Sequence, residues 1–218
     1  AAWRRGDDLV GLPDGGFAPL PRAWLETHGE QVALLLEGTG AGETTGHKAP
    51  VVASLLEATG GEVPDALQAV VDGLRREGGL ALKQDPSGFQ GTLRGYQQEG
   101  WSWLAFLADQ GLGGVLADDM GLGKTVQTLC ALLAEQGKGP ALVVAPTSVL
   151  RNWHREAERF TPSLNTAVLH GPRRGKILAA LQEGSLDLVV TSYAVLRRDV
   201  DELVKVSFRA VVLDEAQA

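Results

Sequence analysis

The sequence predicts an α/β fold in which helices flank a parallel sheet, preceded by a smaller, mainly helical region. Two observations favour this fold class. From Leu93 onward, short apolar runs alternate with longer amphipathic stretches, which is the pattern of strand–helix–strand units. A glycine-rich turn and an acidic pair each come after an apolar run, as ligand-binding residues do at the carboxyl ends of parallel strands. Right-handed crossovers would place helices on both faces of such a sheet.

Residues 1–91 are expected to form the smaller region. It should open with a strand over residues 3–10 and a Gly/Pro-rich turn over residues 11–16. Apolar residues at helical spacing predict three helices, over residues 19–37, 49–59 and 64–77, with a Gly/Thr-rich loop over 38–46. Pro86 and Gly88 mark a domain boundary within residues 81–91, which leaves residues 92–218 as the second domain.

The second domain is expected to alternate strands and helices. Buried strands are predicted over residues 114–117, 141–145, 186–190 and 210–213. Helices are predicted near residues 124–136, 148–160, 175–183 and 192–204. In the second of these helices, Arg151, Arg155 and Arg159 recur every four residues, which indicates either a solvated basic ridge or a phosphate-binding surface.

Composition narrows the class of protein. The chain of 218 residues is 44% hydrophobic, and no apolar run approaches the roughly 20 residues of a membrane helix. The only cysteine is Cys130, which favours an intracellular setting and a role as a small core residue. The four histidines lack the spacing of a metal site, so no structural metal is expected. Of the net charge of −7, residues 1–91 carry −6 and residues 92–218 only −1, which leaves room for a local basic face.

The turn over Gly121–Thr125 has the character of a phosphate-binding loop. Its glycines let backbone N–H groups approach a phosphate, and the helix that follows adds about half a positive charge at its N-terminus. Lys124 would reach the β- and γ-phosphates, and the Thr125 hydroxyl would ligate Mg²⁺. Asp118 stands where the strict G-x-x-x-x-G-K-[ST] pattern has glycine, and a surface turn is the alternative interpretation.

The acidic pair Asp214–Glu215 follows the apolar run over residues 210–213. Asp214 would hold the Mg²⁺ shell, and Glu215 would orient or deprotonate an attacking water. The alternative is a helix N-cap followed by a first-turn glutamate. Together with the glycine-rich loop, the pair is typical of a P-loop ATPase.

Five ordered blocks carry a family resemblance. They are residues 93–104 (LRGYQQEGWSWL), 116–125 (LADDMGLGKT), 144–146 (VAP), 190–193 (VTSY) and 214–217 (DEAQ). In this order they closely resemble the Snf2 family, superfamily 2 ATPases that translocate on double-stranded DNA. The resemblance covers residues 92–218. It implies a first RecA-like ATPase lobe that uses ATP and Mg²⁺.

The resemblance also implies roles for individual residues. Lys124, Asp214 and Glu215 would be catalytic, and Thr125 and Asp214 would hold Mg²⁺. The nucleotide would contact Gln97, Met120, Gly121, Leu122, Gly123, Lys124, Thr125 and Val126, with the Gln97 amide pairing with the adenine edge. Residues 146–148 and 191–193 match stretches that contact a DNA backbone through N–H and hydroxyl groups.

Two departures refine this resemblance. Gly95 stands where the family usually has proline, and Gln217 stands where many eukaryotic members have histidine, a form that resembles the bacterial branch. The expected setting is therefore a bacterial cytoplasm, associated with the nucleoid. Residues 1–91 resemble the tail of a helical accessory region of bacterial members, and no functional residue is assigned there.

The chain stops directly after the acidic motif, so we expect a fragment that lacks the second lobe and its arginine finger. The expected partners of the full-length protein are double-stranded DNA and other DNA-bound proteins, and no membrane. Two alternatives are an interaction module without turnover and an RNA helicase of the same superfamily. The spelling of residues 118–123 disfavours the helicase.

Overall fold

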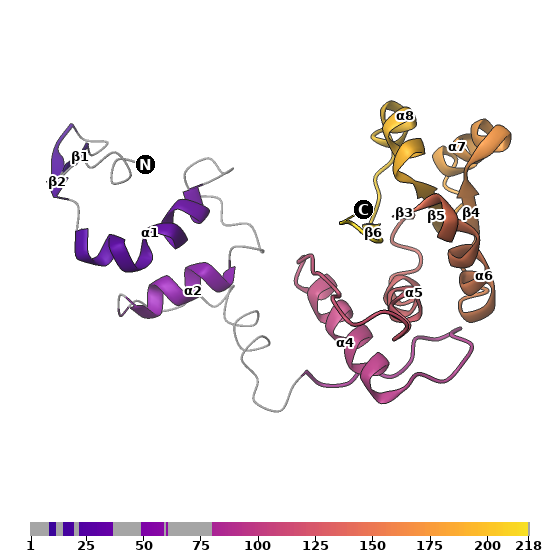
Figure 1. Ribbon diagram of the computed structural model, residues 1–218, viewed down its shortest axis with the longest axis horizontal. Coiled ribbons are helices and arrows are strands. Elements are labelled where there is room, and N and C mark those ends of the chain that lie inside the picture. The colour runs from indigo at the N-terminus through magenta and orange to yellow at the C-terminus, as the bar shows by residue number, and fades with distance from the viewer. Residues whose placement is uncertain are drawn as a thin grey trace. The chain divides into compact units, whose positions relative to one another are not determined.

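The computed structural model describes residues 9–11, 15–19, 22–36, 49–58, 60 and 80–217. Contacts divide the chain into two compact units, Ala1–Gly79 with Ala108–Gly113, and Leu80–Leu107 with Gly114–Ala218, and each is described by itself. Figure 1 shows the elements along the chain. The predicted loop over 38–46 and the predicted helix over 64–77 lie outside the described residues.

The first unit contains a short hairpin and two helices. Its elements are β1 (Leu9–Gly11), β2 (Phe17–Pro19), α1 (Arg22–Leu36) and α2 (Ala49–Ala58). The two strands pair antiparallel, and the helices contact each other, with Leu25 and Leu55 buried. The helix predicted over 19–37 begins three residues late, at Arg22, because Pro19 belongs to strand β2.

The second unit is built on a four-stranded parallel sheet. Its strands are β3 (Ala141–Ala145), β4 (Thr166–Leu169), β5 (Leu188–Ser192) and β6 (Ala210–Leu213), in the order β4-β5-β3-β6. Every neighbouring pair is parallel. Strands β3 and β5 are buried along their whole length, as expected for a sheet covered on both faces.

Helices pack on both faces of this sheet. They are α5 (Lys124–Ala134), α6 (Leu150–Phe160), α7 (Arg174–Gln182) and α8 (Tyr193–Leu203), with 3₁₀ turns at Thr147–Val149 and Gly171–Arg173. Helix α4 (Gly95–Asp109) packs on α5 instead, where Trp101 and Ala105 lie against Cys130. Val143 of β3 packs with residues of α5 and α6, whereas Leu142 and Val144 pack with residues of α7 and α8. Alternate side chains of one strand thus supply two cores. The predicted α/β class, a parallel sheet flanked by helices, is confirmed.

The strand predicted over residues 114–117 is wrong. Residues 112–119 form no regular structure, and the Val115 side chain is 83% exposed. The Gly114 backbone instead lies against α4, so close that a Cβ there would come within 2.4 Å of Leu107 Cδ1. A run of four apolar residues suggests an extended segment, but it does not specify which strand would pair with it.

Three further differences concern the other strands. The strand predicted over 186–190 lies at 188–192, because Thr191 and Ser192 are buried and continue the pairing with β3. Strand β4 was not expected, since Thr166–Leu169 contains only two β-branched residues and a single fully buried side chain. The run over 210–213 forms a strand, but its side chains alternate between half-buried and exposed instead of being fully buried.

Residues 80–94, which include the predicted boundary, belong to the second unit. The Lys83 N–H donates to Ser102 Oγ at 2.9 Å, and the Phe89 and Phe160 rings stack with centroids 6.1 Å apart. Cys130 is buried in the same region, as predicted for a core residue. Burial, and to a lesser degree Asp85, raises the pKa of the Cys130 thiol to about 12, so the thiol stays protonated.

Candidate nucleotide-binding and catalytic site

The glycine-rich loop has the backbone conformation that a phosphate cradle needs. Gly121 and Gly123 have φ of 84° and 76°, in the left-handed region where glycine is unstrained. Gly123 is the N-cap of α5, so the N–H groups of the first turn are oriented toward the loop. A Cβ at Gly123 would lie 2.5 Å from Gln97 Nε2, so this position also lacks space for a side chain.

Lys124 closes over the loop that precedes it. Its ammonium donates to the carbonyl oxygens of Asp118, at 2.7 Å, and Asp119, at 3.1 Å. Both acceptors are neutral, and an anionic phosphate is a stronger acceptor for the same ammonium. The Thr125 hydroxyl donates no hydrogen bond within the described residues and therefore remains available as a metal ligand.

Gln97 connects α4 to the glycine-rich loop. Its Oε1 accepts from the Arg94 N–H at 3.0 Å, and its Nε2 donates to the Leu122 carbonyl at 3.1 Å. Beside it, Tyr96, Trp103, Asp118 and Leu122 help to line an open cavity of about 450 Å³. The predicted nucleotide residues Gln97 and Leu122 are thus in direct contact, whereas the Met120 side chain is 88% exposed.

Gln127 is a site residue that the sequence did not reveal. It is fully buried on α5, and its Nε2 donates to Asp118 Oδ2 at 3.2 Å. Its Oε1 is packed against Gly100 of α4, where a Cβ would lie 1.8 Å away. The only sequence signal was a polar residue on the buried face of a predicted helix.

Three hydrogen bonds hold Asp214 at the carboxyl end of β6. Its N–H donates to the Val144 carbonyl at 2.8 Å, and its own carbonyl accepts from the Tyr193 hydroxyl at 2.9 Å. Its carboxylate oxygen Oδ2 accepts from the Trp153 indole N–H at 2.8 Å. Asp214 is therefore tied to β3, α6 and α8. Neither Trp153 nor Tyr193 was predicted to touch it.

Two neighbours of Asp214 have unusual environments. Glu215 has φ of 51°, the only positive φ of a non-glycine residue in the described part of the chain, and its side chain is exposed. Such strain is typical of functional positions. Burial, together with the carboxylates of Asp214 and Glu215, raises the pKa of the Tyr193 phenol above its usual value. The phenol therefore stays protonated and keeps donating to Asp214.

The two predicted DNA-contact stretches differ in whether their side-chain hydroxyls are free of internal partners. Thr147 and Ser148 are exposed. The Thr191 hydroxyl instead donates to the Leu169 carbonyl, and the Ser192 hydroxyl accepts from the Val195 N–H, both inside the protein. The Tyr193 hydroxyl also has an internal partner, the Asp214 carbonyl. All three hydroxyls of residues 191–193 are therefore already hydrogen-bonded inside the protein.

The phosphate loop and the acidic pair form two separate clusters. Within the described residues, no hydrogen bond or ion pair joins Lys124 or Thr125 to Asp214 or Glu215. In the same residues, no group of three or more His, Cys, Asp and Glu side chains could hold a metal ion by itself. One hydroxyl and one carboxylate suit Mg²⁺, which takes few protein ligands and completes its shell with phosphates and water.

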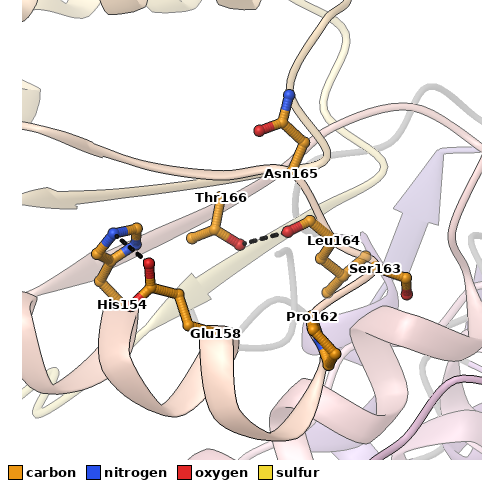
Figure 2. A pocket seen from close by; sticks show the side chains of 7 residues that line it. All are labelled: His154, Glu158, Pro162, Ser163, Leu164, Asn165 and Thr166. Atoms are coloured by element: carbon orange, nitrogen blue, oxygen red, sulfur yellow. Dashed lines mark hydrogen bonds and ion pairs between the residues drawn. The ribbon is translucent and has the colours of Figure 1, made fainter.

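Two further features lie apart from this site. An open cavity of about 380 Å³, shown in Figure 2, is lined by His154, Glu158 and residues 162–166, and contains the His154–Glu158 ion pair at 3.5 Å. It adjoins the amino end of β4, whereas Asp214 lies past the carboxyl end of the parallel strand β6. Among the described helices, none has the length and apolar character needed to cross a membrane.

A glycine-rich loop before helix α5 and an acidic pair after strand β6 of a parallel α/β sheet define the class of P-loop ATPase domains. The SNF2-related domain matches residues 96–218, so this chain belongs to the SNF2-related family. Its fold is the RecA-like fold of the SWI2/SNF2 ATPase core, as predicted from the five sequence blocks.

Several relatives show this similarity. A Bacillus subtilis protein described as an ATP-dependent helicase/translocase, YwqA, is 50% identical over 141 residues, which cover 62% of this chain and 15% of that protein. The human chromatin-remodeling ATPase INO80 is 42% identical over 146 residues, covering 61% of this chain and 9% of that protein. This chain therefore spans a small part of the length of these relatives.

Solved structures agree with this assignment. The Sulfolobus solfataricus SWI2/SNF2 ATPase core in complex with dsDNA matches with a TM-score of 0.58 and 41% identity, over 63% of this chain and 29% of that one. The same core domain in a second structure gives a TM-score of 0.54 and 39% identity.

Proposed function

We propose that this chain is the nucleotide-binding lobe of an ATP-driven translocase that acts on double-stranded DNA. In the full-length protein, ATP hydrolysis would move DNA or displace proteins bound to it. The observation that carries the proposal is the pair of clusters at Lys124 and Asp214, in a chain that belongs to the SNF2-related family. The named relatives and the dsDNA complex support the choice of substrate.

The proposed roles follow the chemistry of the side chains. Lys124 binds the β- and γ-phosphates, and backbone N–H groups over residues 120–126 surround them. Gln97 orients the adenine, since its amide both donates and accepts. Glu215 accepts a proton from the attacking water, and its exposed carboxylate is accessible to that water.

Mg²⁺ would be held by Thr125 and Asp214. The Thr125 hydroxyl and Asp214 Oδ1 fit this role, because neither makes a hydrogen bond within the described residues. When bound together with ATP, the ion neutralises part of the phosphate charge. Asp214 stays aligned for it through its bonds to Val144, Trp153 and Tyr193.

For DNA, we propose that the exposed turn at Thr147–Val149 supplies phosphate contacts. Thr147 and Ser148 present hydroxyls there, and the turn leads directly into α6. Helix α6 exposes three arginines, Arg151, Arg155 and Arg159. Their exposure is compatible both with a solvated basic ridge and with a phosphate-binding surface. Residues 1–91 are proposed as an accessory region, and a bacterial, nucleoid-associated setting as its location.

Steady-state ATP hydrolysis by the full-length protein tests the proposal. Duplex DNA should raise the hydrolysis rate several-fold, and RNA of the same length should not. Equal stimulation by RNA would favour the helicase alternative, and no hydrolysis under any condition would favour an interaction module. The variant Lys124→Ala serves as the control for a contaminating ATPase.

A further inference from the structure

The indole of Trp153 lies between the protein core and the acidic motif. The residue belongs to α6 and is only 3% exposed, packed with Leu150 and Ala157 of the same helix and with Val143 of β3. Close packing of this kind restricts rotation of the ring. Its single polar atom, Nε1, nevertheless reaches Asp214 Oδ2 at 2.8 Å, 61 residues further along the chain.

This contact selects between the two oxygens of the Asp214 carboxylate. An indole N–H is a donor only, so it pairs with the ionised carboxylate and cannot itself bind a cation. It occupies Oδ2, and Oδ1 has no hydrogen-bond partner within the described residues. A hydrogen bond to a charged acceptor is stronger than one between neutral groups, so the carboxylate is held in this orientation.

A second buried tryptophan provides a comparison within the same unit. Trp101 on α4 is 2% exposed and packs against Ala105 and Cys130. Its Nε1 has no hydrogen-bond partner in the described structure. Both indoles fill the core to the same extent, but only the Trp153 indole also donates to an acidic residue of the candidate site.

We propose that Trp153 is a positioning residue for the metal site. Its N–H holds Oδ2 of Asp214, so that only Oδ1 is left as a ligand for Mg²⁺. The inference rests on the proposed function, which assigns Asp214 to the metal. Residues 146–148 lead directly into α6, so the helix that carries Trp153 also connects the proposed DNA contact to the metal-binding acid.

The test removes the N–H and keeps the ring. In the full-length protein, Trp153 is replaced by 3-benzothienylalanine, whose sulfur takes the place of the indole N–H in a ring system of nearly the same shape. The same replacement at Trp101 is the matched control. Calorimetry then measures the affinity for a non-hydrolysable ATP analogue with Mg²⁺ and with EDTA, and electron paramagnetic resonance measures Mn²⁺ binding to the protein–nucleotide complex.

At position 153, the gain in nucleotide affinity that Mg²⁺ provides should fall by about tenfold, as expected on losing one hydrogen bond to a charged group. Mn²⁺ binding should weaken to the same degree. The affinity in EDTA should stay unchanged, and the Trp101 replacement should leave all three values unchanged. The variant Trp153→Phe, which removes the N–H and leaves a smaller ring, should reproduce the loss of the Mg²⁺ effect.

A normal Mg²⁺ effect and normal Mn²⁺ binding at position 153 would overturn the inference. An equal loss at Trp101 would overturn it too, because the effect would then come from packing alone. The variant Asp214→Asn tests the metal-binding role of Asp214 separately from the positioning role of Trp153. If that variant also keeps the full Mg²⁺ effect, the assignment of Asp214 fails; if it loses the effect while the Trp153 replacement keeps it, only the role of Trp153 fails.

Discussion

At the scale of single residues, Lys124 shows how the loop is stabilised without a phosphate. Its ammonium bonds to the carbonyl oxygens of Asp118 and Asp119, so its charge is not left without acceptors. A phosphate group must take over from these carbonyls when it binds, which it can do because it is anionic. Affinity for ATP therefore depends on the difference between the two sets of contacts.

Replacing Lys124 by alanine should weaken ATP binding by tenfold to a hundredfold. This loss of affinity corresponds to the roughly 1.5–3 kcal/mol that hydrogen bonds to a charged group contribute. Calorimetric titration of the full-length protein with ATP measures the change in affinity. The matched control is Lys138→Ala, which removes an exposed lysine paired with Glu135 at 2.7 Å and should leave the affinity for ATP as it was. Unchanged affinity in the Lys124 variant would exclude the phosphate-binding role of the loop.

Glu215→Gln should separate binding from chemistry. The amide keeps the shape of the side chain but cannot accept a proton, so turnover should fall by about 10²–10⁴-fold while ATP stays bound. Single-turnover hydrolysis, measured beside nucleotide affinity, gives both quantities. Hydrolysis at the parental rate would show that Glu215 is not the base.

The residues of this site were predictable to different degrees. Gly121 and Lys124 stand in a motif whose spacing itself encodes the chemistry. Trp153 lies on the buried face of α6, and that position in the sequence says nothing about where Nε1 points. The internal hydrogen-bond partners of Thr191 and Ser192 could not be predicted from the sequence either, because they depend on how the chain folds around β5.

At the scale of elements, periodicity predicted helices α5 to α8 to within two residues at each end, and two strands matched their apolar runs to the residue. Helix α4, over Gly95–Asp109, was not predicted. Strand β3, over residues 141–145, is central, so both of its faces are apolar and its pattern is continuous. The segment over 114–117 has a similar composition but is mostly exposed, with only Gly114 against α4, and β4 is only partly buried. Pairing partners decide such cases, and a local pattern contains no information about them.

The contact between α4 and α5 can be tested with a pair of glycines. In Gly100→Ala, the new Cβ would lie 1.8 Å from the buried Oε1 of Gln127, so the amide must leave its place beside Asp118. Overpacking of this kind lowers the free energy of unfolding by about 1–3 kcal/mol. Thermal or denaturant unfolding of the chain measures the loss.

The control for that variant is Gly175→Ala on α7. A Cβ there meets nothing within 4 Å, so the change should be neutral or stabilising by about 0.4–1 kcal/mol. Equal stability of the two variants would mean that Gln127 has room to move and that the α4–α5 contact does not depend on glycine.

At the scale of the whole molecule, the chain covers only a small share of its relatives, 15% of the Bacillus protein and 29% of the archaeal ATPase core. Its net charge of −7 offers little attraction to DNA beyond local patches. We therefore expect residues 1–218 alone to bind duplex DNA weakly and to hydrolyse ATP slowly.

That expectation can be measured with labelled duplex at several salt concentrations. The slope of log affinity against log salt scales with the number of phosphates neutralised, so it should be shallow for this chain. Submicromolar binding with a steep salt dependence, or strong stimulation of hydrolysis by DNA, would show that residues 1–218 are a self-sufficient motor.

Translocation itself is tested most directly by displacement of a third strand from a DNA triplex. The full-length protein, started on the duplex flank, should release the labelled third strand only when ATP and Mg²⁺ are present. Glu215→Gln should bind ATP and release none. Vigorous ATP hydrolysis without strand release, or release that continues in Glu215→Gln, would contradict a translocase driven by the site at Lys124 and Asp214.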